Sequence, residues 1–182
     1  MEILLILFAV IIIAAAATVA LLSLSGVSIR DMLIDEQRLV VPYTALSGLE
    51  PHRAHPTDAG ADLCLANTVV LQPSDRKLAG TGVHVAIPEG YVGLLVPRSS
   101  LPHKYGVTLA NSPGIIDSDY RGEIKLNLHN IDRKQIILPV GQRVAQLLIM
   151  PVELAQFRYS DTLPDTVRGD GGHGSTGTGA AA

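Results

Sequence analysis

The chain has 182 residues, with 14 Lys and Arg against 17 Asp and Glu, a net charge of −3 and 47% hydrophobic residues. This length suggests one domain plus an appendage and leaves little room for a second catalytic domain. The slight negative charge excludes the broad basic field with which nucleic-acid-binding proteins collect phosphates, so we expect no nucleic-acid partner. Cys64 is the only cysteine, which excludes an intramolecular disulfide and a multi-cysteine zinc site.

The amino-terminal segment, residues 1–25, is strongly hydrophobic. It contains an uncharged stretch of about 22 residues, which is long enough for a helix to cross a membrane. A cleaved signal peptide is the alternative, but Glu2 occupies the place of a basic n-region. Arg30 and Arg38 follow the stretch, and the positive-inside rule then places the main domain in the cytoplasm. We therefore predict one transmembrane helix that tethers the chain to the membrane, and a linker over residues 26–37 that could form a short helix.

Residues 38–167 contain short apolar stretches separated by Pro and Gly turns, a pattern typical of an all-β domain. Within this region, Ile124, Leu126 and Leu128 alternate with polar residues, as expected of a half-buried strand. Many short strands in about 120 residues indicate a barrel or a double-sheet jelly roll. The clearest expected strands cover residues 83–87, 91–96, 124–129, 136–140 and 144–150.

Three groups of polar residues are candidates for a functional site. Residues 97–100, Pro-Arg-Ser-Ser, follow an expected strand and combine a guanidinium with two hydroxyls, which suits phosphate oxygens. Residues 111–122 contain an amide, two carboxylates, a phenol and a guanidinium within turn-forming sequence. Asp62 and Gln146 are polar residues within otherwise apolar stretches, and such groups are either paired with partners or functional. For the first two groups, a surface turn without function is the alternative.

The tail, residues 168–182, is rich in glycine and carries Arg168, Ser175 and Thr176. It has too little apolar surface to fold alone, so we expect it to be mobile. Its backbone N–H groups and one guanidinium could wrap around an anion. A plain flexible tail is the alternative.

Taken in order, five segments resemble the five motifs of the trimeric dUTPase family, the deoxyuridine triphosphate nucleotidohydrolases. The segments are AGADL from Ala59, PRSSL from Pro97, residues 111–122 continuing through EIKLNLHN, GQRVAQLL from Gly141, and RGDGGHGSTG from Arg168. Together they cover roughly residues 38–177, and their joint occurrence is far more specific than any single motif. The resemblance implies an all-β jelly-roll subunit, a homotrimer whose active sites are shared between subunits, and a carboxy-terminal arm over residues 168–182 that closes over a neighbouring site.

The resemblance also implies a reaction, the hydrolysis of dUTP to dUMP and pyrophosphate, which lowers dUTP and supplies dUMP for thymidylate synthesis. Asp117 resembles the general base that activates a water for in-line attack on the α-phosphorus. Asp62 resembles the aspartate that holds Mg²⁺ through water. The residues that match phosphate-binding positions of the family are Arg98, Ser99, Ser100, Gln146, Arg168, Gly174, Ser175 and Thr176. Those that match its base-binding and sugar-binding positions are Asn111, Gly114, Ile115, Ile116, Tyr120 and His173.

One arm position departs from the family pattern, because His173 stands where Phe is common. Histidine can still stack on uracil, and its titration near neutral pH could add a pH dependence.

A dCTP deaminase, alone or combined with dUTPase activity, is a rival function. Asn127 argues against it, because Asn127 stands at the position where the deaminase family has its catalytic Glu. A second rival is a membrane-tethered dUTP-binding regulatory module without turnover. The residues that argue against this module are Asp117, Arg98, Ser99, Tyr120 and Arg168, which all match the enzyme pattern.

Overall fold

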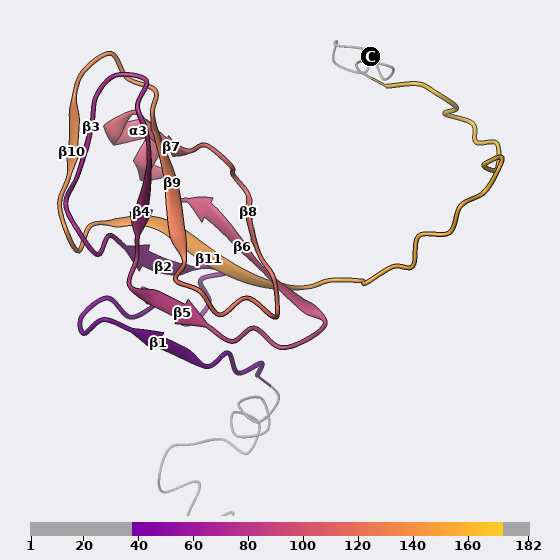
Figure 1. Cartoon of the computed structure of the whole chain (residues 1–182), viewed down its shortest axis with the longest axis horizontal. Coiled ribbons are helices and arrows are strands. Elements are labelled where there is room, and N and C mark those ends of the chain that lie inside the picture. Colours follow the sequence, from indigo (N-terminus) through magenta and orange to yellow (C-terminus); the bar gives the residue numbers. More distant parts are fainter. Residues whose placement is uncertain (1–37, 173–182) are drawn as a thin grey trace, which may run out of the picture. The chain divides into compact units, whose positions relative to one another are not determined.

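The computed structural model describes residues 38–172, so the predicted linker over residues 26–37 lies outside the described residues. The same holds for the arm positions His173, Gly174, Ser175 and Thr176. The chain divides into two units, Met1–Val152 and Glu153–Ala182. The strands of the first unit, drawn in Figure 1, are β1 Tyr43–Ala45, β2 Ala61–Cys64, β3 Val69–Leu71, β4 Arg76–Gly80, β5 Val83–Val85, β6 Tyr91–Pro97, β7 Val107–Leu109, β8 Gly114–Ile116, β9 Lys125–Asn130, β10 Ile136–Leu138 and β11 Arg143–Pro151.

The predicted fold class, a β-domain preceded by one transmembrane helix, requires a correction. Within residues 38–172, no helix is long and apolar enough to cross a membrane. Residues 1–25, to which the prediction assigned the helix, lie outside the described residues. The prediction rested on hydropathy alone, and an uncharged stretch of sufficient length is a requirement for a membrane span rather than a demonstration of one. The all-β part of the prediction is confirmed.

The strands form four antiparallel sheets in the described part of the chain. The largest has the order β2-β11-β6-β8, the next has the order β4-β9-β7, and two pairs, β1-β5 and β10-β3, complete the set. The five strand regions expected from the sequence are confirmed as β5, β6, β9, β10 and β11. The other strands have three to five residues each, and neither a recognisable alternation nor a long apolar stretch marks them in the sequence.

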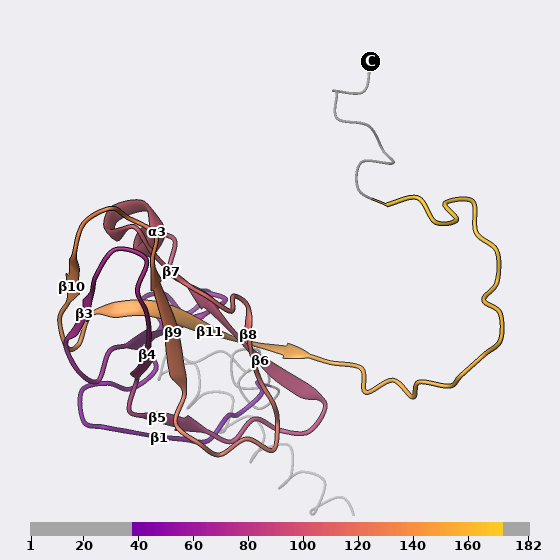
Figure 2. The ribbon, with the colours of Figure 1, turned by 45° about the horizontal axis from the view of Figure 1, so that its top comes forward.

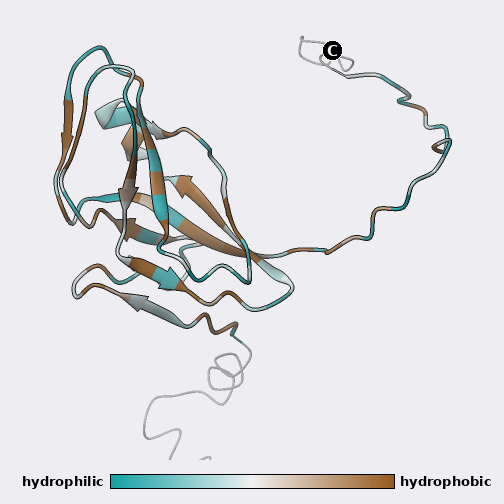
Figure 3. Ribbon diagram, viewed as in Figure 1, coloured by the Kyte–Doolittle hydropathy of each residue, from teal (hydrophilic) through white to brown (hydrophobic). Residues whose placement is uncertain are grey.

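One hydrophobic core is shared by all four sheets. In β9, Leu126 and Leu128 are fully buried, while Lys125 is exposed and Asn127 is half-buried. Figure 3 shows the resulting alternation of hydrophobic and hydrophilic residues along β9. The core therefore fixes which face of each strand points outward, and polar side chains on those faces can build a site.

The chain turns sharply after β6 through a short helix that the sequence did not predict, α3 (Ser100–Tyr105). Six residues are too few to show a helical period. The stop signals are nevertheless present, because Gly106 adopts a left-handed conformation (φ 61°) and donates its N–H to Pro102 O at 3.1 Å. The helix begins directly after Arg98 and Ser99, so it places both residues at the point where β6 ends.

The second unit is described over residues 153–172, where it forms no helix and no strand. Its large apolar side chains are exposed: Leu154, Phe157, Tyr159, Leu163 and Val167. A segment that buries so little apolar surface gains little free energy from folding by itself.

The loop between β9 and β10 depends on one buried amide, which yields a stability prediction. The Asn130 side chain is fully buried, and its Nδ2 lies within 3.2 Å of the carbonyl oxygens of Leu71, Gln72 and Lys134. Asn130→Ala removes the side-chain donor to these three oxygens, of which Gln72 O still accepts from Asp75 N, so we expect the free energy of unfolding to fall by about 2–3 kcal/mol. Chemical denaturation at fixed protein concentration measures this value. The exposed Asn67→Ala is the matched control, with an expected change within about 0.5 kcal/mol; equal effects of the two substitutions would contradict the assignment.

Candidate functional site

Asp62 is held between two arginines at one end of the largest sheet. Its neighbour in β2, Leu63, points into the core, so the Asp62 side chain points to the other face of the strand. Arg98 Nε lies 3.1 Å from Asp62 Oδ1, and Arg143 Nη1 lies 3.2 Å from Asp62 Oδ2. The Asp62 side chain is only 13% exposed, whereas the side chains of Arg98 and Arg143 are 30% and 42% exposed. Two cations around one carboxylate leave a net positive charge that faces solvent and can bind an anion.

Gln146 belongs to the same group of residues. It is the direct partner of Asp62 in the pairing of β11 with β2, and the partner of Val96 in the pairing of β11 with β6. A Cβ atom at Gly60 would lie only 2.6 Å from Gln146 Oε1, so the absence of a side chain at Gly60 makes room for the Gln146 amide. The glycine of the AGADL segment thus has a steric role beside the glutamine.

Arg98 and the two serines occupy the turn that leaves β6. The Arg98 backbone N–H donates to Val144 O at 3.1 Å, which fixes the start of this turn against β11. Ser99 is the N-cap residue of α3, but its side chain makes no capping hydrogen bond and it is exposed. Ser100 is half-buried at the first helical position. The exposed Ser99 hydroxyl is therefore placed to donate to a ligand oxygen beside the Arg98 guanidinium.

Arg143 is a member of this group that sequence reasoning missed. The pairing of β11 with β2 shifts register between Arg143 and Ala145, which marks a β-bulge. Because of this bulge, Val144 and Ala145 are both fully buried, and Arg143 is directed at Asp62. A pattern of strict alternation cannot reveal this orientation, since the alternation breaks at that point.

Asp117 lies in a tight turn directly after β8, and it is exposed. The turn is closed by a hydrogen bond from Tyr120 N to Asp117 O at 3.2 Å. The Tyr120 hydroxyl donates to Glu123 O at 2.9 Å, which fixes the orientation of the ring. An exposed carboxylate on a closed turn is accessible to solvent and to a ligand.

The other residues of the third segment surround β8. Gly114 is buried against Leu95 of β6, and its backbone lies next to the Asn111 amide. Ile115 is 57% exposed and Ile116 is half-buried. A polar amide, an open stretch of backbone and exposed apolar atoms therefore lie together, a combination that suits a planar heterocyclic ring.

These residues form two groups at opposite ends of β6. Ile116 pairs with Gly93, so Asp117 follows at the level of Val92, whereas Arg98 lies beyond the other end of the strand. Six residues of extended chain correspond to about 20 Å. The fold therefore brings Asp62, Arg98 and Gln146 together but keeps them apart from Asp117 of the same chain. Figure 2 shows the strands that carry these residues, β2, β11, β6 and β8.

Arg168 belongs to the second unit, where its Nε donates to Gly171 O at 2.7 Å and its own carbonyl oxygen accepts from Gly171 N at 3.0 Å. These contacts form a local turn at the start of the glycine-rich tail. The remaining arm residues with expected roles lie outside the described residues.

Cys64 lies close to Asp62 in β2, and the pKa of its thiol is clearly shifted. Burial raises the pKa of the thiol, the nearby Arg143 guanidinium lowers it, and the Asp62 carboxylate raises it again. The net result is a pKa above the usual value, so the thiol remains protonated at neutral pH. A protonated, half-buried thiol acts as a small packing residue.

Comparison with known proteins assigns the family. A family model described as dUTPase matches residues 48–177. The deoxyuridine 5′-triphosphate nucleotidohydrolase of Leifsonia xyli subsp. xyli is 52% identical over 128 residues, which cover 70% of this chain and 84% of that protein. The solved structure of the Staphylococcus bacteriophage 80alpha dUTPase with dUPNHPP has a TM-score of 0.72 at 29% identity, covering 78% of this chain and 100% of that chain.

A second similar structure is of a dUTPase described with a metal ion. A mutant dUTPase from phage phi11 of S. aureus, described with the coordination of a structural Mg(II) ion, has a TM-score of 0.64 at 27% identity. The match covers 70% of this chain and 100% of that chain. Since the family model spans well over half of the sequence, and since the segments that carry the resemblance lie inside the matched range, this chain belongs to the dUTPase family.

Proposed function

We propose that this chain hydrolyses dUTP to dUMP and pyrophosphate. The observation that carries the proposal is the group formed by Asp62, Arg98 and Gln146, where three segments distant in the sequence meet on one face of the largest sheet. Family membership and the nucleotide analogue in the related phage enzyme support the same substrate. In this reaction the product dUMP is available for thymidylate synthesis, and the concentration of dUTP falls.

The triphosphate binds beside Asp62, where the guanidinium groups of Arg98 and Arg143 leave a net positive charge. Arg98 offers a guanidinium, Ser99 and Ser100 offer hydroxyls, and Gln146 offers an amide N–H. These donors stabilise the negative charge that shifts between phosphate oxygens as the bond to the leaving pyrophosphate breaks. From the arm, Arg168, Gly174, Ser175 and Thr176 complete the set of phosphate donors in our proposal.

The nucleoside binds around β8. Asn111 and the backbone of Gly114, Ile115 and Ile116 read the hydrogen-bonding edge of uracil, and His173 stacks on the ring. The Tyr120 ring, whose hydroxyl is bound to Glu123 O, excludes a ribose 2′-hydroxyl. A cytosine edge presents a donor where uracil has an acceptor, which leaves buried polar groups unpaired and lowers affinity.

Asp117 is the general base in this proposal. Its carboxylate accepts a proton from the water that attacks the α-phosphorus in line with the leaving pyrophosphate. The closed turn supports this role, since it holds the carboxylate on a short, hydrogen-bonded loop. The water must lie within about 3 Å of Asp117 for this transfer.

Magnesium is part of the proposal, with Asp62 as its protein contact. Within residues 38–172, no group of three or more His, Cys, Asp and Glu side chains is placed to hold a metal ion. A magnesium ion that keeps several waters and binds mainly to substrate phosphates needs no such group. Asp62 already forms ion pairs with two guanidinium groups, but a carboxylate has about four lone-pair positions and can also accept from a metal-bound water. When bound, the metal would offset the negative charge of the triphosphate.

A homotrimer with shared sites is the assembly that we propose. Asp117 and Arg98 lie at opposite ends of β6 in one chain, so a site that uses both needs residues from a second copy. The exposed apolar side chains of the second unit, among them Phe157 and Tyr159, support an assembly in which they are covered. Closed cyclic symmetry with three copies provides three equivalent shared sites.

Deamination of dCTP is the less supported chemistry. Asn127, at the position that matches the deaminase's catalytic Glu, is half-buried in β9, and its backbone carbonyl oxygen accepts from Ala110 N at 2.8 Å. A neutral carboxamide cannot take up and return the protons that deamination requires. No contact of Asn127 favours that reaction.

Product analysis tests the proposed function. With Mg²⁺ present, we expect the chain to convert dUTP to dUMP and pyrophosphate and to leave dCTP and UTP unchanged. Removal of the metal with a chelator should abolish most of the turnover, because the charge of the triphosphate is then not offset. Chromatography of the nucleotides gives the answer. Release of ammonia from dCTP would favour the deaminase, and binding of dUTP without any product would favour a regulatory module.

The role of Asp117 is tested by Asp117→Asn. Loss of the base should lower kcat for dUTP at least about 100-fold, because general bases contribute factors of this size or more, while KM changes little. Steady-state kinetics measures both constants. The matched control is Asp119→Asn, which removes an exposed carboxylate from the same turn and should leave kcat nearly unchanged. If both variants have wild-type kcat, Asp117 is not the base.

A further inference from the structure

The turn that carries Asp117 is held by one arginine, Arg121. The Arg121 Nη1 group donates to Ser118 O at 2.7 Å and to Tyr120 O at 2.9 Å. A single guanidinium nitrogen therefore binds two carbonyl oxygens of the turn that begins at Asp117. Hydrogen bonds from a charged donor are shorter and stronger than neutral ones, so this contact restrains the turn more than a backbone bond alone.

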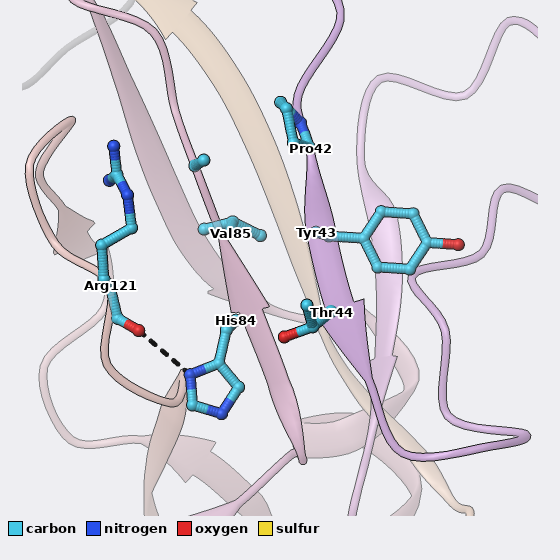
Figure 4. A pocket seen from close by; sticks show the side chains of 7 residues that line it. Pro42, Tyr43, Thr44, His84, Val85 and Arg121 are labelled. Carbon is cyan, nitrogen blue, oxygen red and sulfur yellow. Dashed lines mark hydrogen bonds between the residues drawn. The ribbon is translucent and has the colours of Figure 1, made fainter.

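The backbone of Arg121 is in turn attached to β5. His84 Nδ1 lies 3.0 Å from Arg121 O, and because a carbonyl oxygen only accepts, Nδ1 carries the proton and donates. Figure 4 shows this bond, with the Arg121 guanidinium directed away from the His84 ring. Arg121 thus contacts the Asp117 turn through its side chain and β5 through its main chain.

Further hydrogen bonds join residues 121–124 to residues 81–84. Gly82 N donates to Glu123 Oε1 at 2.8 Å, and Ile124 N donates to Val83 O at 2.8 Å. The buried Thr81 hydroxyl donates to Ile124 O at 2.7 Å. Residues 121–124 are therefore fixed to residues 81–84. Because the Arg121 side chain also binds Ser118 O and Tyr120 O, the Asp117 turn is held in place relative to β5.

We propose that Arg121 is a positioning residue that fixes the Asp117 carboxylate for proton transfer, and that His84 supports it. This inference rests on the proposed function, because it takes Asp117 as the base. Arg121 acts through the main chain of Ser118 and Tyr120, and no contact of Arg121 with substrate is required. Misplacement of a catalytic group by a fraction of its contact distance lowers the rate of the chemical step while substrate binding is retained.

The test compares two substitutions at each position. Arg121→Gln removes the charged double donor, and we expect kcat for dUTP to fall roughly 10- to 100-fold with little change in KM. Arg121→Lys keeps one charged donor and should retain an intermediate kcat. His84→Ala should lower kcat less than Arg121→Gln, and His84→Asn, whose side-chain amide can donate in place of Nδ1, should restore it.

A second readout does not depend on activity. Amide hydrogen exchange, followed by mass spectrometry of peptides, should be faster in Arg121→Gln over residues 117–121 and unchanged over β9. The matched control is Arg133→Gln, which removes an exposed arginine from the loop between β9 and β10. This control should have wild-type kcat and wild-type exchange.

The outcomes separate the two proposals. If the wild-type protein does not hydrolyse dUTP, the proposed function fails, and the positioning role fails with it. If the wild-type protein is active but Arg121→Gln has the kcat of Arg133→Gln, only the positioning role is overturned. Faster exchange throughout β9 in Arg121→Gln would likewise overturn it, since the residue would then be structural. If Arg121→Gln does not fold, kcat of Arg121→Lys and of the two His84 variants decides, and wild-type kcat in all three would overturn the proposal.

Discussion

The pairing of β11 with both β2 and β6 is the constraint on which the phosphate-binding group depends. This pairing places Gln146 opposite Asp62 on one side and opposite Val96 on the other, so three segments far apart in the sequence meet within two strand spacings. The ion pairs of Asp62 with Arg98 and Arg143 then fix the charged side chains on this frame. A half-buried carboxylate with a single cation would bind an anion poorly, whereas the second guanidinium leaves positive charge available to a ligand.

The length of β6 determines how the reaction can be organised. Its seven residues separate the phosphate-binding end from the end where the Asp117 turn begins, and neither group can reach the other within one chain. Assembly of several copies then becomes part of catalysis, because oligomerisation alone brings the base to the phosphates. The turn that begins at Asp117 therefore has no contact with the phosphate-binding residues of its own chain. Its geometry depends on local hydrogen bonds, among them those of Arg121 and Glu123.

The sequence predicts the long strands and the outward position of the polar residues, but not the contacts between segments. Ile124, Leu126 and Leu128 show a clear alternation, and all three are buried as expected. Asp62 was recognisable as a polar residue that needs partners, yet its partner Arg143 depends on a bulge that interrupts the alternation. Arg121 binds the Asp117 turn through hydrogen bonds to main-chain oxygens. Because every residue has such an oxygen, no pattern of residue types predicts these bonds. The transmembrane helix was predicted from hydropathy alone, a property that does not by itself establish a helix.

Complementation between two inactive variants tests the central claim most directly. Arg98→Gln and Asp117→Asn chains are each expected to be inactive alone, and they are refolded together in equal amounts before kcat for dUTP is measured. If each site takes Arg98 from one copy and Asp117 from another, random mixing restores about one quarter of the wild-type kcat, because one site in four receives both intact residues. If each site is built within a single chain, every chain in the mixture carries a defect, and absence of activity in the mixed oligomers would contradict the account.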